Sequence, residues 1–317
     1  MTEHRPVMLA EVLEVLAPAD GNVVVDATFG RGGVTAALAR AARCAVWALD
    51  RDPEAVAAGA ALEAEFSGRV VVIRARFGDM EDALAQRGVT KVDGVAFDLG
   101  VSSPQLDDPA RGFSFADGPL DMRMDPSGDT AADVVNSLEE TELSRIIFEL
   151  GEERYARRVA KAILEARRRA PITRTAELAA LIAKVVPPER RDSGVSIHPA
   201  TRTFQALRMH VNDEIGELRR GLAAAERLLA PDGRLAVIAF HSIEDREVKR
   251  FLTLRSDRAP APSRHLPAMA PREPSFRLIE RGVRRPSDAE VAMNPRARSA
   301  RLRAAVRTPA AAWEEAA

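Results

Sequence analysis

Residues 26–33 read DATFGRGG and lie between an apolar segment and an alanine-rich segment. The apolar run Val23–Val25 precedes them, and the alanine-rich segment Val34–Arg43 follows them. This order predicts a strand, a glycine turn and a helix. Glycine lets the backbone pass close to a ligand, and the first turn of a helix supplies unpaired N–H groups. The pattern is therefore typical of the entrance to a nucleotide-type binding site.

Two acids flank this turn and narrow the class of ligand. Asp50 closes the next apolar run, Cys44–Leu49, twenty residues after Gly30, where a carboxylate can accept hydrogen bonds from both hydroxyls of a ribose. Asp26 opens the turn, and the spacing G-x-G-G departs from the G-x-G-x-x-G of nicotinamide sites. An acid at this point repels a pyrophosphate but suits the cationic S-adenosylmethionine. For the glycines alone, a tight turn without a ligand is the alternative.

The composition indicates a soluble globular protein. The chain has 317 residues, enough for one large domain or two ordinary ones, with 46% hydrophobic and 29% charged residues. Its single cysteine, Cys44, excludes an internal disulfide framework and favours a cytoplasmic location. No apolar run approaches the roughly 20 residues of a membrane helix, and the first residues lack the apolar core of a signal peptide. We therefore expect no membrane partner.

The first hundred residues alternate between predicted strands and helices, which indicates an α/β fold with a doubly wound parallel sheet. The predicted strands span 23–29, 44–50, 69–75 and 92–99, with helices over 34–43 and 53–66 and a short helix after Gly78. Alternation resumes with a long helix over 201–229, a strand over 234–240 and a helix over 243–255. A proline-rich segment, 259–274, predicts a mobile loop before two last strands over 276–282 and 300–307.

The middle of the chain does not show the alternation of predicted strands and helices. Residues 101–200 contain no predicted strand, and a turn-rich segment leads into predicted helices over 131–135, 139–150, 153–169 and 175–185. We therefore predict an inserted helical domain over 106–200. Residues 1–105 and 201–317 would then form the two parts of the sheet domain.

Basic side chains gather in two segments, although the net charge is only −1. Residues 151–174 carry eight basic residues against three acids, and residues 272–307 carry ten arginines against four acids. Clustered arginines suit phosphate contacts and favour an RNA partner, whereas either cluster alone is equally consistent with a solvated helix face. Aromatic residues make up 4% of the chain, and Tyr155 is the only one in the first segment. This scarcity argues against a broad stacking platform for single strands.

The segment Asp98–Gln105 follows the fourth predicted strand, at the edge where a doubly wound sheet binds its ligands. Asp98, Ser102, Ser103 and Gln105 offer polar groups to a substrate amine. Cys44 is not placed to act as the thiolate that methylation of a ring carbon requires, so transfer to an exocyclic amine is favoured. Positioning supplies most of the rate of such a transfer. The alternative is a polar turn whose serines bond to the local backbone.

A second polar cluster, Phe240–Arg246, follows the fifth predicted strand and places His241 at the same edge of the sheet. We expect His241 to position the substrate or to accept the late proton, with a structural hydrogen-bond role as the alternative. Ser242 with Asp245 predicts a capped start of the following helix.

Longer motifs carry a resemblance to a known family. They are HRPVML at 4–9, DATFGRGG at 26–33, DRDP at 50–53, the segment 98–108, RGFSF at 111–115, GPLDMRMD at 118–125, GEER at 151–154, HPATRTFQ at 198–205, FHS at 240–242 and NPRARS at 294–299. With these motifs, which span nearly the whole chain, the sequence closely resembles the bacterial 16S rRNA cytosine-N4 methyltransferase family, MraW or RsmH.

The resemblance implies a class I, Rossmann-like methyltransferase fold whose inserted helical domain recognises the substrate. It implies S-adenosylmethionine as methyl donor, no metal, and a decoding-centre cytidine of 16S rRNA in the small ribosomal subunit as acceptor. The donor contacts that it implies are Gly32, Gly33, Val34, Asp50, Phe77, Asp98 and Gln105. We expect catalytic roles for Asp98, Ser102, Ser103 and His241. The family often has histidine where this chain has Val34, so a contact there is limited to backbone or apolar atoms. A homodimer is left open.

Two other functions stay open on the sequence alone. The chain could be an RNA-binding assembly factor that keeps a donor site without transferring a methyl group, although the intact segment 98–105 argues against this. It could also methylate an amine of DNA. Enzymes of that kind carry an Asp/Ser/Asn-Pro-Pro-aromatic turn after the fourth strand, which Ser102–Gln105 only partly matches.

Overall fold

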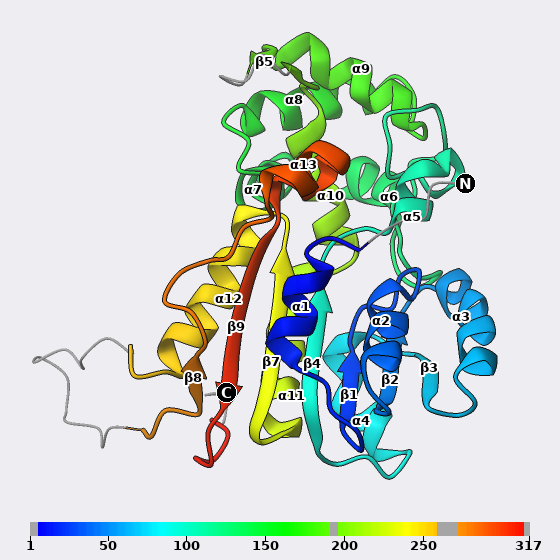
Figure 1. Cartoon of the computed structure of the whole chain (residues 1–317). Coiled ribbons are helices and arrows are strands. Elements are labelled where there is room, and N and C mark those ends of the chain that lie inside the picture. The colour runs from blue at the N-terminus through cyan, green and yellow to red at the C-terminus, as the bar shows by residue number, and fades with distance from the viewer. Residues whose placement is uncertain (1–5, 191–195, 259–271, 314–317) are drawn as a thin grey trace, which may run out of the picture. The chain divides into compact units, whose positions relative to one another are not determined.

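The computed structural model describes residues 6–190, 196–258 and 272–313. The predicted mobile loop at 259–274 lies almost entirely outside these residues. The chain divides into two compact units, Met1–Gly100 with Ile215–Ala317 and Val101–Glu214. We call them the sheet unit and the helical unit. Figure 1 shows the strands of the first and the helices of the second.

The sheet unit is built on seven strands in the order β3-β2-β1-β4-β7-β9-β8. Their bounds are β1 Val23–Asp26, β2 Ala45–Asp50, β3 Val70–Arg74, β4 Val92–Asp98, β7 Leu229–Ala239, β8 Phe276–Leu278 and β9 Arg301–Arg307. The first five strands of this order pair in parallel, and β9 runs antiparallel to both β7 and β8. The strand order reverses between β1 and β4, which is where doubly wound sheets bind their ligands.

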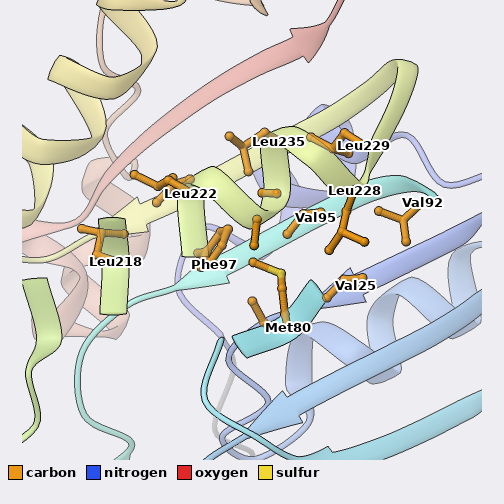
Figure 2. Close-up of a cluster of buried hydrophobic side chains, with 14 of the residues drawn as sticks. Val25, Met80, Val92, Val95, Phe97, Leu218, Leu222, Leu228, Leu229 and Leu235 are labelled. Atoms are coloured by element: carbon orange, nitrogen blue, oxygen red, sulfur yellow. The ribbon is translucent and has the colours of Figure 1, made fainter. Parts of the chain in front are cut away.

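Helices cover both faces of this sheet because its strands are apolar on both sides. Val24 and Ala96 belong to one buried cluster, whereas their neighbours Val25 and Val95 belong to the other. Figure 2 shows the second cluster, in which strand residues such as Phe97 meet helix residues such as Leu222. The helices of this unit are α1 Leu9–Leu16, α2 Gly33–Ala41, α3 Pro53–Glu65, α4 Met80–Ala85, α11 Glu214–Leu228, α12 Ser242–Leu254 and α13 Asp288–Met293, with short 3₁₀ turns η1 Phe77–Asp79 and η3 Pro295–Ser299.

The helical unit has a core of its own. Leu143, Ile146 and Ile147 lie three and four residues apart on one helix face and are buried. The unit's helices are α5 Ser103–Asp107, α6 Ala131–Ser137, α7 Glu140–Gly151, α8 Ala156–Arg167, α9 Thr175–Val185 and α10 Thr201–Val211, with the 3₁₀ turn η2 Pro109–Arg111. Within the described ranges, no helix of either unit has the length and apolar character that a membrane crossing requires.

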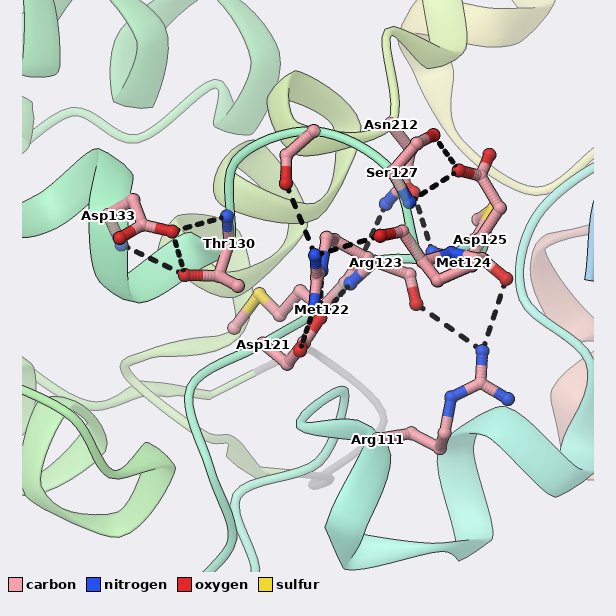
Figure 3. A network of polar contacts seen from close by, with 12 residues as sticks. Arg111, Asp121, Met122, Arg123, Met124, Asp125, Ser127, Thr130, Asp133 and Asn212 are labelled. Atoms are coloured by element: carbon pink, nitrogen blue, oxygen red, sulfur yellow. Dashed lines mark hydrogen bonds and ion pairs between the residues drawn. The ribbon is translucent and has the colours of Figure 1, made fainter.

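A polar network holds the segment 118–125 of the helical unit in place (Figure 3). The Asp121 carboxylate accepts two hydrogen bonds from the Arg123 guanidinium at 2.8 and 2.9 Å. Arg111 donates to the carbonyls of residues 123 and 124. The Asn212 amide donates to the Met122 carbonyl at 2.8 Å and accepts from the Met124 N–H at 2.8 Å. The charged residues of this segment therefore have a structural role.

The predicted long helix over 201–229 is wrong. Two helices, α10 and α11, replace it, with Asn212 and Asp213 between them. Asp213 has a left-handed backbone, with φ of 47°, which a continuous helix cannot contain. The division between the two units falls directly after this break, at Glu214, whereas the predicted domain boundary stood at 200/201.

The expectation of no strand within 101–200 is also wrong, although only in a small detail. The two-residue strands β5 Glu189–Arg190 and β6 Ser196–Ile197 pair antiparallel. Strands this short carry no alternation that a sequence pattern could show. In the sheet unit, β7 begins earlier than predicted because Leu229 already pairs with Val92, and the register shifts between this pair and the next one, Gly94 with Arg234.

Candidate active site at the carboxyl edge of the sheet

Three of the predicted site segments come together because parallel strands end at one edge. Asp26, Asp50 and Asp98 are the last residues of β1, β2 and β4. In the sheet, β1 lies between the other two strands. His241 follows the end of β7, the neighbour of β4, and is half-buried. Phe77 follows β3.

Asp50 is held by the glycine turn that the sequence singled out. Its Oδ2 accepts a hydrogen bond from the Gly30 N–H at 2.8 Å, and its Oδ1 accepts one from the Asp52 N–H at 2.9 Å. Burial raises the pKa of Asp50, against the hydrogen bonds from Asp52 and Gly30, which lower it. A carboxylate fixed in this way keeps further lone pairs for the hydroxyls of a ribose.

The glycines of the turn differ in what they face. A side chain at Gly32 would overlap Leu62, and one at Gly33 would overlap Pro6. Packing explains the absence of a side chain at Gly33, and packing together with a left-handed φ of 74° explains it at Gly32. At Gly30, which has a left-handed φ of 54°, a side chain would meet nothing closer than 3.9 Å. The open side of the turn is at Gly30.

The start of α2 offers backbone N–H groups. Helix α2 begins at Gly33, and the first N–H groups of a helix have no partner within it. The Val34 side chain is buried in the cluster on one face of the sheet. Any ligand contact at Val34 is therefore made through its backbone.

Asp26 has an internal role. Its carboxylate accepts a hydrogen bond from the Thr35 hydroxyl at 2.7 Å and one from the Thr28 N–H at 3.2 Å. These bonds tie the start of the turn to α2. Burial raises the pKa of Asp26 to about 6, against the hydrogen bonds from Thr35 and Thr28. Asp26 is fully buried, which leaves its side chain no exposed surface for a direct ligand contact.

Among the residues of this site, Asp98 gives the clearest indication of where a ligand could bind. Its Oδ1 is buried and has no hydrogen-bond partner within the described residues. Burial first, and then the negative charges of Asp26 and Glu244, raise the pKa of Asp98 to about 7. The backbone N–H of Asp98 donates to the Thr28 hydroxyl at 2.7 Å, which fixes the residue against the glycine turn. A buried acceptor without a partner costs stability, and such atoms call for a functional explanation.

Phe77 is positioned by residues that the sequence did not indicate. Its ring meets Phe97 edge to face, with centroids 5.6 Å apart. Glu217 of α11 is buried, accepts a hydrogen bond from the Gly78 N–H at 3.0 Å and pairs with Arg76 at 3.6 Å. This carboxylate therefore holds both sides of the turn that carries Phe77. Glu217 lies 139 residues from Gly78, so no local pattern could reveal the contact.

The start of α12 differs from the predicted cap. The residue before the helix is His241, and the buried Glu244 accepts hydrogen bonds from the N–H groups of Phe240 and His241 at 2.9 and 3.0 Å. Asp245 instead pairs with Arg303 at 2.6 Å and Arg301 at 3.1 Å. The prediction of a cap from Ser242 with Asp245 is therefore wrong, because β9 supplies arginines that the local sequence does not show. Glu244, three residues after His241, is the residue from which this cap could have been predicted.

Ser102, Ser103 and Gln105 belong to the helical unit. They begin α5, with Ser102 as the capping residue. The Gln105 side-chain oxygen accepts a hydrogen bond from the Ser102 N–H at 3.0 Å. Ser103 and Gln105 are buried. Hydrogen bonding within the start of α5 therefore accounts for part of the polar pattern at residues 102–105.

Cys44 is a buried hydrophobe. Its thiol donates to the Leu38 carbonyl at 3.5 Å, and burial raises its pKa. A thiol in this state is a poor nucleophile. Within the described part of the chain, no group of three or more His, Cys, Asp or Glu side chains is arranged to hold a metal ion.

Arginines of both basic segments make internal contacts in the structure. In the second, Arg284 pairs with Glu14 at 2.7 Å, Arg301 and Arg303 pair with Asp245, and Arg307 is buried against backbone carbonyls. These arginines stabilise the sheet unit. In the first, Arg167 donates to the carbonyls of Val135 and Leu138 at 2.8 and 2.7 Å and so closes the end of α6.

Comparison with known proteins decides the family. The model of the MraW methylase family matches residues 1–308. The chain belongs to this family. A protein of Paramagnetospirillum magneticum named ribosomal RNA small subunit methyltransferase H is 59% identical over 314 residues, 98% of each chain. A protein of Rhodospirillum centenum with the same name is 62% identical over 311 residues, 98% of this chain and 93% of that one.

Membership in the MraW methylase family agrees with the architecture. The sheet unit has the Rossmann-like arrangement of class I methyltransferases, in which parallel strands end in acids around a glycine turn and a last strand runs antiparallel. The helical unit is inserted between β4 and α11. The predicted fold class is therefore confirmed.

Proposed function

We propose that this member of the MraW methylase family transfers a methyl group from S-adenosylmethionine to the N4 amine of a decoding-centre cytidine in 16S rRNA. We place the reaction in the cytoplasm, on rRNA within the small ribosomal subunit. The support for an rRNA substrate is the identity of 59% and 62%, over nearly the whole chain, to proteins named ribosomal RNA small subunit methyltransferase H.

The observation that carries the chemistry is the unpartnered Oδ1 of Asp98 at the end of β4, an atom for which the described residues provide no donor. The orphaned acceptor fits a ligand that brings an N–H or O–H group to this edge of the sheet. Asp50, held by Gly30 and Asp52, fits a ribose, and the start of α2 offers N–H groups to a carboxylate. The residues present therefore fit S-adenosylmethionine, whose sulfonium supplies an electrophilic methyl group.

The side chains of this site need only bind the methyl donor and the substrate amine and orient them for transfer. An exocyclic amine attacks along its lone pair, so its N–H groups must be held by acceptors. We assign one acceptor role to Asp98, and further roles in substrate positioning to Ser102, Ser103 and His241. The proposed donor contacts, besides Asp50 and Asp98, are Gly32, Gly33, Val34, Phe77 and Gln105. The nitrogen becomes acidic once it carries the methyl group, so a weak base such as the Asp98 carboxylate is sufficient to take the proton.

The test is transfer of label from methyl-labelled donor to isolated small ribosomal subunits that lack the modification. We expect label in 16S rRNA, recovered as N4-methylcytidine after digestion to nucleosides. Label found only in another nucleoside would contradict the proposed target atom. If labelled donor binds and no label reaches any RNA, the chain acts as a binding factor. If duplex DNA accepts the label as well as the subunits do, the rRNA assignment is wrong.

A further inference from the structure

A hollow of about 790 Å³ opens in the helical unit, between α7 and the start of α8. Residues of both helices and of the turn between them line it, among them Arg145, Phe148, Arg154, Tyr155, Arg157 and Arg158. The functional site described above contains none of these residues. The hollow therefore needs an explanation of its own.

The aromatic side chains of the hollow are exposed. Phe148 is 62% exposed and Tyr155 is 36% exposed. Exposed aromatic rings are uncommon in this chain, in which only 4% of the residues are aromatic. The guanidinium of Arg158 lies 5.3 Å from the centroid of the Tyr155 ring. Rings and guanidinium planes together are the surfaces on which unpaired bases stack.

The charges of the hollow are unbalanced. Arg154 and Arg157 are exposed and have no ion-pair partner within the described residues. Arg145 is paired with Glu149 at 2.9 Å and Glu142 at 3.9 Å, so it contributes little net charge. Among the residues that line the hollow, Glu140 is the single acid. The remaining positive charge suits phosphate groups.

The position of these arginines is unfavourable for the helix itself. Arg157 and Arg158 lie in the first turn of α8, which contains no acid. A helix N-terminus is positively polarised, so cations there lower helix stability whereas anions raise it. An arrangement that costs stability in the free protein becomes favourable when a phosphate binds.

The turn that carries Arg154 and Tyr155 is well defined. Glu152 has a left-handed φ of 50°, and a side chain at Gly151 would meet the Arg202 carbonyl at 2.5 Å. The buried Glu153 carboxylate accepts a hydrogen bond from the Tyr155 N–H at 2.8 Å. These contacts fix the backbone of the turn and so hold its exposed side chains in place.

We propose that this hollow is a second RNA-binding site, which takes an unpaired base of the rRNA on Phe148 and Tyr155 and adjacent phosphates on Arg154 and Arg157. The inference rests on the proposed rRNA substrate and adds to it a contact outside the methyl-transfer site. It assigns the recognition of single-stranded or looped RNA to the α7–α8 face.

The test compares two double variants of equal charge. Arg154→Gln with Arg157→Gln removes the proposed phosphate contacts, and Arg168→Gln with Arg169→Gln removes two exposed charges outside the hollow. Affinity for 16S rRNA is measured over a range of salt concentrations without methyl donor. We expect the first variant to bind roughly 10-fold more weakly and to lower the slope of log K against log salt by about 1 to 2 relative to the second.

Phe148 gives an independent test of stacking. Because Phe148 is exposed, Phe148→Ala should fold normally, and we expect about a 10-fold loss of RNA affinity, with Phe148→Trp restoring it. Equal RNA affinity of the two double variants, or no effect of Phe148→Ala, would overturn the proposal. So would a change from dimer to monomer in the hollow variants at unchanged RNA affinity, because a second copy would then be the occupant. These binding data do not depend on methyl transfer, so a failure of the proposed function remains distinguishable.

Discussion

At the scale of single residues, Asp98 is the side chain on which the proposed methyl transfer depends most. Its Oδ1 has no partner within the described residues, and its pKa lies near 7. Only the ionised carboxylate offers acceptor oxygens alone, and the burial that leaves Oδ1 without a donor also raises the pKa and so opposes ionisation below about pH 7. Function and stability therefore oppose each other at this position.

The first prediction concerns the rate of transfer. Asp98→Asn keeps the shape of the side chain but places an amide donor where an acceptor is needed, and we expect a loss of about 100-fold in transfer to the rRNA. In the native protein the rate should rise as the pH passes through about 7, because Asp98 ionises there. Initial rates across roughly pH 5.5–9 check this. A slow variant with an unchanged pH profile would exclude Asp98 as the titrating group.

The second prediction concerns stability. The folded state raises the pKa of Asp98 from 3.8 to about 7, so the folded protein binds this proton more tightly than the unfolded chain. The contribution to the free energy of unfolding is fully present below pH 3.8 and is lost as the pH rises through about 7. At pH 8, Asp98→Asn should therefore raise the free energy of unfolding by on the order of a few kcal/mol, and with it the melting temperature. A lower melting temperature at that pH would contradict the unfavourable burial of this carboxylate.

The third prediction concerns Asp50. Asp50→Ala should weaken the binding of S-adenosylmethionine by about 1.5–3 kcal/mol, because charge-assisted hydrogen bonds to the ribose are lost. Calorimetry of donor binding measures the effect. Glu65→Ala removes an exposed acid of α3 and is the matched control. An unchanged dissociation constant for Asp50→Ala would reject the ribose assignment.

At the scale of elements, the entrance of α2 depends on close packing. A side chain at Gly33 would overlap Pro6, so we expect Gly33→Ala to lower the free energy of unfolding by about 1–3 kcal/mol and to weaken donor binding. Gly282→Ala is the control, since a side chain there would meet nothing within 4 Å. Denaturant titration and donor calorimetry compare the two. If both variants bind donor like the native protein, the geometry of this turn does not position the ligand.

The end of α6 depends on one arginine. Arg167 donates to two carbonyls at this end, so Arg167→Ala should destabilise the helical unit by about 1–2 kcal/mol. Hydrogen exchange of the α6 amides should speed up in this variant and remain unchanged in Arg168→Ala, whose side chain is exposed. Unchanged exchange in both variants would show that the contact is not needed. Arg167 is thus a poor choice for testing RNA binding.

How much could be predicted from the sequence depends on the range of the interaction. The strands, the glycine turn and the acids at the strand ends were predictable because each depends on a local pattern. The break after α10 was not, since Asn212 bonds to Met122 and Met124, about ninety residues away. The ion pairs of the arginines could not be predicted either, because partners such as Arg284 and Glu14 lie 270 residues apart in the sequence.

At the scale of the whole molecule, the two units divide the proposed work. The sheet unit carries Asp50, Asp98 and the glycine turn, and the helical unit carries the α7–α8 hollow. Because the proposed contacts of the hollow lie apart from the reacting atoms, substitutions there should lower RNA affinity, whereas substitutions at Asp98 should lower the rate. The substitutions at Asp98 and at Arg154 with Arg157 are therefore expected to change different constants.

The most direct measurement is a map of modified nucleotides in 16S rRNA from cells with and without this protein. We predict that N4 methylation of one decoding-centre cytidine disappears when the protein is absent. Expression of the native chain should restore the mark, and expression of Asp98→Asn should not. An unchanged mark in cells that lack the protein, with no other nucleotide altered, would contradict the proposed function.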